Sequence, residues 1–381
     1  MIGRFRRTLA RHATNYRGWR TDRKIVVIES DDWGSTCMPS AETFRKLVDK
    51  GIRVDKCPYT SFDALASEQD LEDLFSVLTG FKDMNGAHPA ITANTVMMNP
   101  DFGRIRNSGF REYVGEPFTE ALKRYPKHAR SFSLWKEGIS DGIFFPQFHG
   151  REHLNVKGWM KSLQSPDSVY RTVFDEEMFW PGSAVKRAGE MSIRAAYDTE
   201  SLSELDRHRE IIHDGLKQFE ELFGYRSESF IAPNFVYHPD LNKTLAEGGV
   251  EIIQGMKYQK LPIAGSEKRG MLRRIQGQRN DLGQINLVRN CVFEPSQKPD
   301  NYDSVGECLE GIKNAFFWKK PAVITAHRLN FIGYIVPENR EKNLKMFRDL
   351  LKKMLQRWPD IQFMTSPELG HVIAESIQPS L

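Results

Sequence analysis

Short apolar runs alternate with longer amphipathic stretches along most of this chain, and this alternation limits the folds open to it. Residues 24–30 (KIVVIES) hold four consecutive apolar residues, the pattern of a strand buried on both faces. Residues 203–223 carry apolar side chains at helical spacing and end at Gly224. Further strands are expected at 90–97, 143–148, 229–232, 251–253, 285–293, 322–325 and 361–364, and further helices at 40–50, 240–247, 304–317 and 338–357. This β-then-α order predicts an α/β fold with a parallel sheet, open or closed into a barrel.

The chain of 381 residues can form one large domain, which we expect over residues 24–375. Residues 55–140 fit the β-then-α order least well, so we interpret them as a large insertion after the first strand–helix unit. No long apolar run follows Met1, and the four cysteines show no CxxC spacing. These features predict a cytoplasmic protein with reduced thiols.

Residues 1–23 form a basic N-terminal arm, with seven arginines against the single acid Asp22. Such an arm could contact anionic lipid or nucleic acid, or it could be a solvated helix. The rest of the chain is nearly neutral, because the whole chain carries a net charge of only +4. We therefore do not expect nucleic acid as the main ligand, and peripheral membrane contact through residues 1–23 stays open.

Acidic and imidazole side chains follow the predicted strands. Asp31 and Asp32 come after residues 24–30, and His149 and His153 come after residues 143–148. Asn234 follows the strand at 229–232, and His327 follows the strand at 322–325. The carboxyl ends of parallel strands carry the chemistry of such folds, so we expect these groups at one rim.

This set of residues predicts a metal site. His149 and His153 are four residues apart, so on a helical turn both imidazoles would face the same way. Either Asp31 or Asp32 could add the third ligand, leaving a position for water, and the other could act as a base. A histidine pair or an aspartate pair alone is more often structural, but their occurrence at several strand ends favours a site. We expect one divalent ion, zinc first, although cobalt, nickel or iron would also suit these ligands.

Three segments resemble the motifs of the polysaccharide deacetylases, or NodB-homology carbohydrate esterases. They are IESDDWGS (28–35), HGREH (149–153) and VITAHRLNF (323–331). The resemblance implies a distorted parallel (β/α) barrel of about seven strands. It also implies that Asp31 is the general base and His327 the general acid, and that the metal ligands are Asp32, His149 and His153.

The chain departs from this family where a third motif usually has an arginine that orients the base. Ile231 stands at that position, and Arg151 and Arg328 are our candidates to replace the arginine. Asn234 could present an amide near the site. Trp33 could stack on a sugar ring, although tryptophan is more often a core residue.

A fourth motif, an aspartate with a following tryptophan, has no clean match, and residues 290–294 are the nearest strand end. A protonated His327 requires a nearby carboxylate that raises its pKa, and the sequence does not identify one.

The expected function is a metal-dependent hydrolase that removes an N- or O-linked acetyl group from a carbohydrate. The alternative is a non-catalytic, metal-containing glycan-binding protein on the same fold. Ile231 in place of the motif arginine is the feature that favours this alternative.

Overall fold

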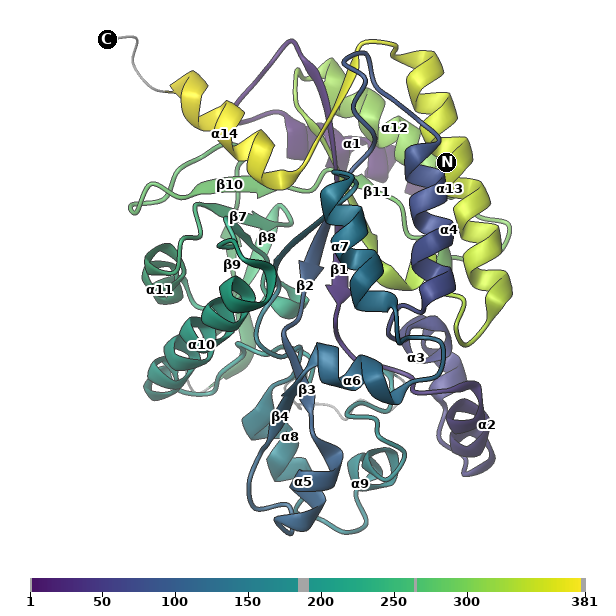
Figure 1. Cartoon of the computed structure of the whole chain (residues 1–381). Helices are drawn as coiled ribbons and strands as arrows, with labels where there is room; N and C mark the ends of the chain where they lie inside the picture. Colours follow the sequence, from purple (N-terminus) through teal and green to yellow (C-terminus); the bar gives the residue numbers. More distant parts are fainter. Residues whose placement is uncertain (1, 184–191, 264–265, 378–381) are drawn as a thin grey trace.

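A curled, mostly parallel sheet lies at the centre of the molecule and helices surround it (Figure 1). The computed structural model describes residues 2–183, 192–263 and 266–377. Within these ranges no helix is long and apolar enough to cross a membrane.

The central sheet has nine strands, eight of them in the order β10-β7-β6-β5-β2-β1-β12-β11, with β13 paired to β1. All pairings within this sheet are parallel. The strands are β1 (Lys24–Trp33), β2 (Ile91–Thr95), β5 (Phe144–Phe148), β6 (Ser229–Phe230), β7 (Ile252–Gly255), β10 (Ile285–Val288), β11 (Cys291–Val292), β12 (Ala322–His327) and β13 (Ile361–Met364).

One broken strand joins the two ends of this sheet. β10 and β11 are separated only by Arg289 and Asn290. The amide of Arg289 donates to Gly255 O of β7 at 2.9 Å, and the amide of Asn290 donates to Val323 O of β12 at 3.1 Å. The segment therefore bonds to β7 through its first half and to β12 through its second half. This arrangement confirms the predicted distorted (β/α) barrel.

Helices cover the outside of the barrel, and several coincide with the predicted segments. The helix expected at 203–223 is α10 (Leu205–Phe223), which ends at Gly224 in the left-handed region with φ 77°. The others around the sheet are α1 (Ile2–Asn15), α4 (Glu68–Thr79), α7 (Ser131–Ser140), α11 (Asn242–Glu247), α12 (Ser304–Phe317), α13 (Pro337–Arg357) and α14 (Ser366–Ile377).

A second lobe lies beyond the carboxyl ends of β1 and β2 (Figure 1). It has its own hydrophobic core, built from two segments that are distant in sequence: Phe102 and Ile105 pack with Trp159 and Phe174. The elements at this end are β3 (Met98–Pro100), β4 (Gly115–Pro117), α5 (Phe102–Asn107), α6 (Phe118–Arg124), α8 (Val156–Ser162) and α9 (Val169–Phe174), with α2 (Ala41–Asp49) and α3 (Pro58–Phe62) beside them. Residues 55–140 thus contribute β2 to the barrel as well as part of this lobe.

A separate hairpin of β8 (Tyr258–Ile263) and β9 (Ser266–Arg273) follows β7.

The inside of the barrel changes from apolar to charged along β1. Ile25 and Val27 pack with Leu369 and Ile373 of α14, which closes the amino-terminal end. Alternate residues of a strand face the same side, so Glu29 follows Ile25 and Val27 on this inner face. Glu29 is fully buried, and its carboxylate accepts a hydrogen bond from Ser366 Oγ at 2.8 Å. The apolar end supports the barrel, and the charged end carries the functional groups.

We expect Leu369→Ala to lower the free energy of unfolding by about 2–5 kcal/mol, because it opens a cavity in the plug of the barrel. Leu369 has no exposed surface. Chemical denaturation followed by circular dichroism measures this change. His371→Ala, on the same helix but with a half-exposed side chain, is the control and should change stability by less than about 1 kcal/mol. Equal effects would show that α14 does not act as a plug.

Candidate functional site

A bulge at the end of β1 directs the side chains of two consecutive aspartates, Asp31 and Asp32, toward the same site. Between Ser30 and Trp33 the register of β1 against β2 shifts by one residue. Asp32 lies in the left-handed region with φ 73°, which aspartate tolerates better than most residues. A regular strand would direct Asp31 and Asp32 to opposite faces, so the bulge is what brings both carboxylates to the site.

The guanidinium of Arg289 binds both carboxylate oxygens of Asp31. Its Nη1 donates to Oδ2 at 2.6 Å and its Nη2 donates to Oδ1 at 2.6 Å. Its Nε donates to Glu29 Oε2 at 2.5 Å, and Asn94 Nδ2 donates to Asp31 Oδ1 at 2.7 Å. Burial would raise the pKa of Asp31, but the guanidinium of Arg289 outweighs it and holds that pKa well below its usual range. Asp31 is therefore ionised and fixed in orientation.

Arg289 is thus the arginine that binds Asp31, where the sequence suggested Arg151 or Arg328. It comes from the break between β10 and β11, far along the chain from both Arg151 and Arg328. Ile231 has a different part in the site, because its carbonyl oxygen lies 2.8 Å from His149 Nδ1. His149 Nδ1 donates to this carbonyl, and Nε2 is the ring nitrogen directed at Asp32.

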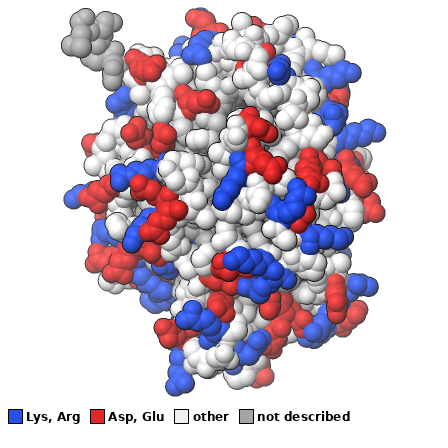
Figure 2. All heavy atoms as spheres, in the orientation of Figure 1, with Lys and Arg blue, Asp and Glu red and all other residues white. Residues whose placement is uncertain are grey.

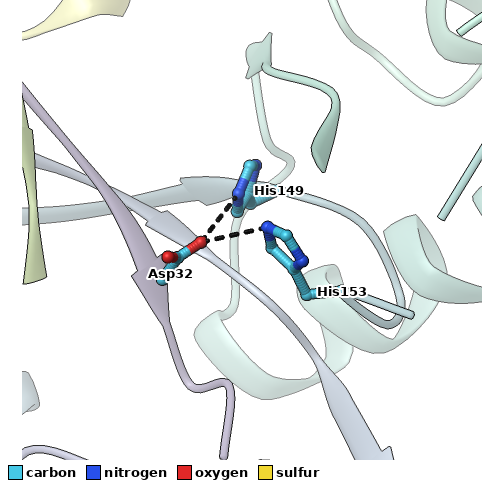
Figure 3. Close-up of side chains that lie close together, drawn as sticks. All are labelled: Asp32, His149 and His153. Carbon is cyan, nitrogen blue, oxygen red and sulfur yellow. Dashed lines mark ion pairs between the residues drawn. The ribbon is translucent and has the colours of Figure 1, made fainter. Parts of the chain in front are cut away.

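Asp32, His149 and His153 form a compact, buried group (Figure 3). Asp32 Oδ1 lies 3.4 Å from His149 Nε2 and 3.1 Å from His153 Nε2. One possible ligand atom from each residue lies within 4.8 Å of the other two. Burial and the nearby Arg194 lower the pKa of His153 to about 4, so its ring is neutral, the form that ligates a metal.

The loop that carries the two histidines is not the helical turn expected from their spacing. Residues 149–155 form no regular helix, and Gly150 has φ 110°, a conformation that favours glycine. A side chain there would also meet Tyr197 and the backbone of Glu152. The tight loop brings the imidazoles together, with ring centroids 5.2 Å apart.

Arg194 binds the other oxygen of Asp32 and has no counterpart in the sequence prediction. Its Nη2 donates to Asp32 Oδ2 at 2.9 Å. Its guanidinium lies 4.6 Å from the ring centroid of Tyr59 and 5.0 Å from that of Trp180. Burial would raise the pKa of Asp32, but Arg194 and His153 hold it well below the usual range. Arg194 therefore keeps Asp32 charged and leaves Oδ1 as the oxygen that faces the two imidazoles.

Glu294 supplies the carboxylate that a protonated His327 requires. His327 ends β12, and its Nδ1 donates to Glu294 Oε1 at 2.5 Å. Asn330 Nδ2 donates to the other oxygen of Glu294 at 2.7 Å. Burial would lower the pKa of His327, but Glu294 outweighs it and the pKa rises to about 9. His327 Nε2 lies 3.8 Å from Asp31 Oδ2, so the protonated imidazole and the ionised aspartate are neighbours.

The other predicted substrate-binding residues lie in different surroundings. The hypothesis that Trp33 stacks on a sugar fails, because its ring is 1% exposed and packs edge-on against Trp135 and Phe144 in the core. Arg328 is buried and forms a two-pronged ion pair with Asp63. Arg151 pairs with Glu152 and Asp214. The predictions that Arg328 or Arg151 orients Asp31 are therefore wrong, because both side chains are paired with other carboxylates.

Asn234 follows β6 near the site, in a left-handed conformation with φ 55°. Its Nδ2 donates to Ser192 Oγ at 2.8 Å. The adjacent Phe235 ring lies 5.9 Å from the guanidinium carbon of Arg289.

The donor set fits a divalent metal ion. His149 Nε2 is buried and has no hydrogen-bond partner among the described residues, although it points at a carboxylate oxygen. Two imidazoles and one carboxylate are the ligand set of a catalytic zinc-type site. A buried Asp/His/His group of this kind could bind a metal.

Comparisons with known proteins give fold-level similarity only. No family model matches the chain, and no curated protein matches it. A Mycobacterium smegmatis protein described as a polysaccharide deacetylase aligns over 96% of both chains, with 14% identity and a TM-score of 0.47. The family 4 acetyl xylan esterase of Clostridium thermocellum, in complex with cobalt, covers 92% of this chain and 91% of its own, with 10% identity and a TM-score of 0.37. A 4-alpha-glucanotransferase of Thermococcus litoralis has a TM-score of 0.47 and 11% identity, covering 94% of this chain but only 41% of its own.

We expect the purified protein, prepared without a histidine tag, to contain about one equivalent of a divalent metal by mass spectrometry. Asp32→Ala and His149→Ala should lose it, since each removes one of three ligands. His213→Ala is the matched control, because His213 is exposed on α10 and outside the site. A wild-type protein that stays metal-free after reconstitution with zinc, cobalt or nickel would contradict this assignment.

Proposed function

We propose that this chain is a metal-dependent hydrolase that removes an acetyl group, N- or O-linked, from a carbohydrate. The observation that carries the proposal is the pairing of an ionised Asp31 with a protonated His327 directly beside the Asp32–His149–His153 group. In this proposal the base is Asp31, the acid is His327 and the metal ligands are Asp32, His149 and His153, as the resemblance implies. We propose zinc as the ion, because two imidazoles and one carboxylate leave one tetrahedral position open for water.

The side chains would divide the reaction between them. When bound, the divalent ion would lower the pKa of water and polarise the acetyl carbonyl. Asp31 accepts the proton of the attacking water, and Arg289 keeps the carboxylate aligned for that transfer. His327 donates a proton to the departing amine or alkoxide from Nε2, while Glu294 holds Nδ1. Asp31 is a weak base because its pKa is low, so the proton transfer to Asp31 depends on the metal ion lowering the pKa of the water.

The binding-only alternative loses its main support. It rested on the absence of the motif arginine at Ile231, and Arg289 makes two hydrogen bonds to Asp31 from another strand. The site thus has an oriented base and an acid with its own carboxylate partner. The Glu294–His327 pair beside Asp31 supports the catalytic interpretation over the binding-only one.

Activity should fall as pH rises through about 9, because His327 must be protonated to donate and its pKa is about 9. In Glu294→Gln the carboxylate that raises the pKa of His327 is lost. The pH at which kcat/KM falls on the alkaline side should therefore decrease by about 1–3 pH units. Rates measured against pH with metal-loaded enzymes test this expectation. Glu228→Gln breaks the other histidine–glutamate pair, with His371 at 2.7 Å, and should leave the pH at which kcat/KM falls unchanged. The same pH in Glu294→Gln as in wild type would rule out His327 as the acid.

Asp31→Asn should lower acetate release from acetylated amino sugars at least about 100-fold while keeping the metal, because Asp31 is the base and not a ligand. The assay is acetate release from N- and O-acetylated sugars by metal-loaded protein. Asp214→Asn, at a half-exposed partner of Arg151, should keep full activity. Loaded wild-type protein that binds such sugars without releasing acetate would overturn the proposed reaction and favour the binding protein.

A further inference from the structure

The N-terminal helix is docked on the barrel along one side. The guanidinium of Arg11 on α1 pairs with Glu307 of α12, and Asn15 Nδ2 donates to Asn314 Oδ1 at 2.8 Å. Trp318 Nε1 donates to His12 Nδ1 at 2.9 Å. These contacts fix which side of α1 faces the protein and which side faces outward.

The outward side of α1 and the end of α12 expose three large apolar side chains together. Leu9 on α1 is 52% exposed, and Tyr16, which follows the last residue of α1, is 57% exposed. The amide of Tyr16 still donates to His12 O at 2.9 Å, so Tyr16 continues the last turn and its spacing of seven residues places it on the same side as Leu9. Phe317, the last residue of α12, is 69% exposed. The Phe317 ring lies 6.0 Å from His12, and the Tyr16 ring lies 5.4 Å from Trp318, so the two helices share this surface. We call Leu9, Tyr16 and Phe317 the apolar triad.

Exposed basic side chains lie on the segments that carry the apolar triad, and we call them the basic rim. Arg17, Arg20, Lys313 and Lys319 are exposed on the same two segments. The guanidinium of Arg20 lies over the Trp318 ring at 6.0 Å. Of the acids on these two segments, Glu307 pairs with Arg11 and Asp22 pairs with Lys319, whereas Glu310 is exposed on α12. Elsewhere, as on the face in Figure 2, acidic and basic side chains are mixed.

We propose that the apolar triad and its basic rim form a docking surface for an anionic lipid membrane. The boundary of an anionic bilayer accommodates exposed aromatic and aliphatic side chains that lie beside arginine and lysine. The charge of the segment selects this partner, because seven arginines lie within residues 1–23 against one acid. The proposal goes beyond the catalytic function and does not depend on it.

This docking would leave the candidate site directed away from the bilayer. Phe317 lies just before the amino-terminal end of β12 (Ala322–His327), and His327 ends the same strand inside the site. Six residues of strand span about 20 Å. α1 and α12 lie at one end of the barrel and the second lobe at the other (Figure 1). A docked protein would therefore meet substrate from the aqueous side.

The test is co-sedimentation of the full chain with vesicles of phosphatidylcholine containing about 25 mol % phosphatidylglycerol. We expect wild-type protein to bind, and Leu9→Ser/Phe317→Ser to lower the partition coefficient about tenfold or more. Arg17→Gln/Lys313→Gln should weaken binding similarly on these vesicles and have no effect with phosphatidylcholine alone. Met271→Ser is the matched control, because Met271 is also 57% exposed but lies on the β8–β9 hairpin.

Wild-type protein that does not sediment with anionic vesicles, or variants that bind as wild type does, would overturn the proposal. Light scattering at several protein concentrations covers the other possible occupant of the surface. A concentration-dependent dimer that Phe317→Ser abolishes would assign the apolar triad to a second copy of the chain and would likewise overturn the lipid proposal. None of these measurements uses substrate or metal, so their outcome is independent of whether the deacetylase assay succeeds.

Discussion

The ion pairs of Arg289 with Glu29 and Asp31 are the interaction on which the charged end of the barrel depends. All three side chains are almost fully excluded from water. Two buried carboxylates side by side would repel each other and lose their hydration without this cation. Burial raises the pKa of Glu29, whereas the doubly bonded Asp31 stays well below its usual range. One guanidinium therefore allows a buried acidic pair and sets which member carries the functional charge.

This arrangement explains why the barrel closes through a broken strand. If β10 continued into β11 as one regular strand, that strand would pair with β7 and with β12 along its whole length. The break at Arg289 and Asn290 instead passes the backbone hydrogen bonds from β7 to β12 and lets the Arg289 side chain extend across the interior to β1. The closure of the sheet and the orientation of Asp31 thus have one structural cause.

The site residues that could be predicted from the sequence are those that directly follow a predicted strand. Asp31, Asp32, His149 and His327 stand at strand ends, and the parallel sheet brings strand ends together whatever the loops do. Arg289 and Arg194 act over long separations in sequence, where register and side-chain reach decide the partner. Arg289 carried a weak signal, because it is the one charged residue in the predicted strand 285–293. Glu294 carried another, because it directly follows that strand, whereas no pattern in the sequence marks Arg194.

Charge balance connects these contacts to the chemistry. Within the site, four carboxylates (Glu29, Asp31, Asp32 and Glu294) face two guanidiniums (Arg194 and Arg289) and the His327 imidazolium. Without a metal the group is slightly negative when all four acids are ionised, so a divalent cation is attracted to it. Once such a cation is present the balance becomes positive, and it becomes more so if the raised pKa of Glu29 leaves that acid neutral. A buried site with excess positive charge favours hydroxide over water and stabilises negative charge that develops on an attacked carbonyl oxygen. In the proposed reaction, the arginines that hold Asp31 and Asp32 would therefore do more than orient them, because they would give the metal-loaded site the sign of charge that hydrolysis requires.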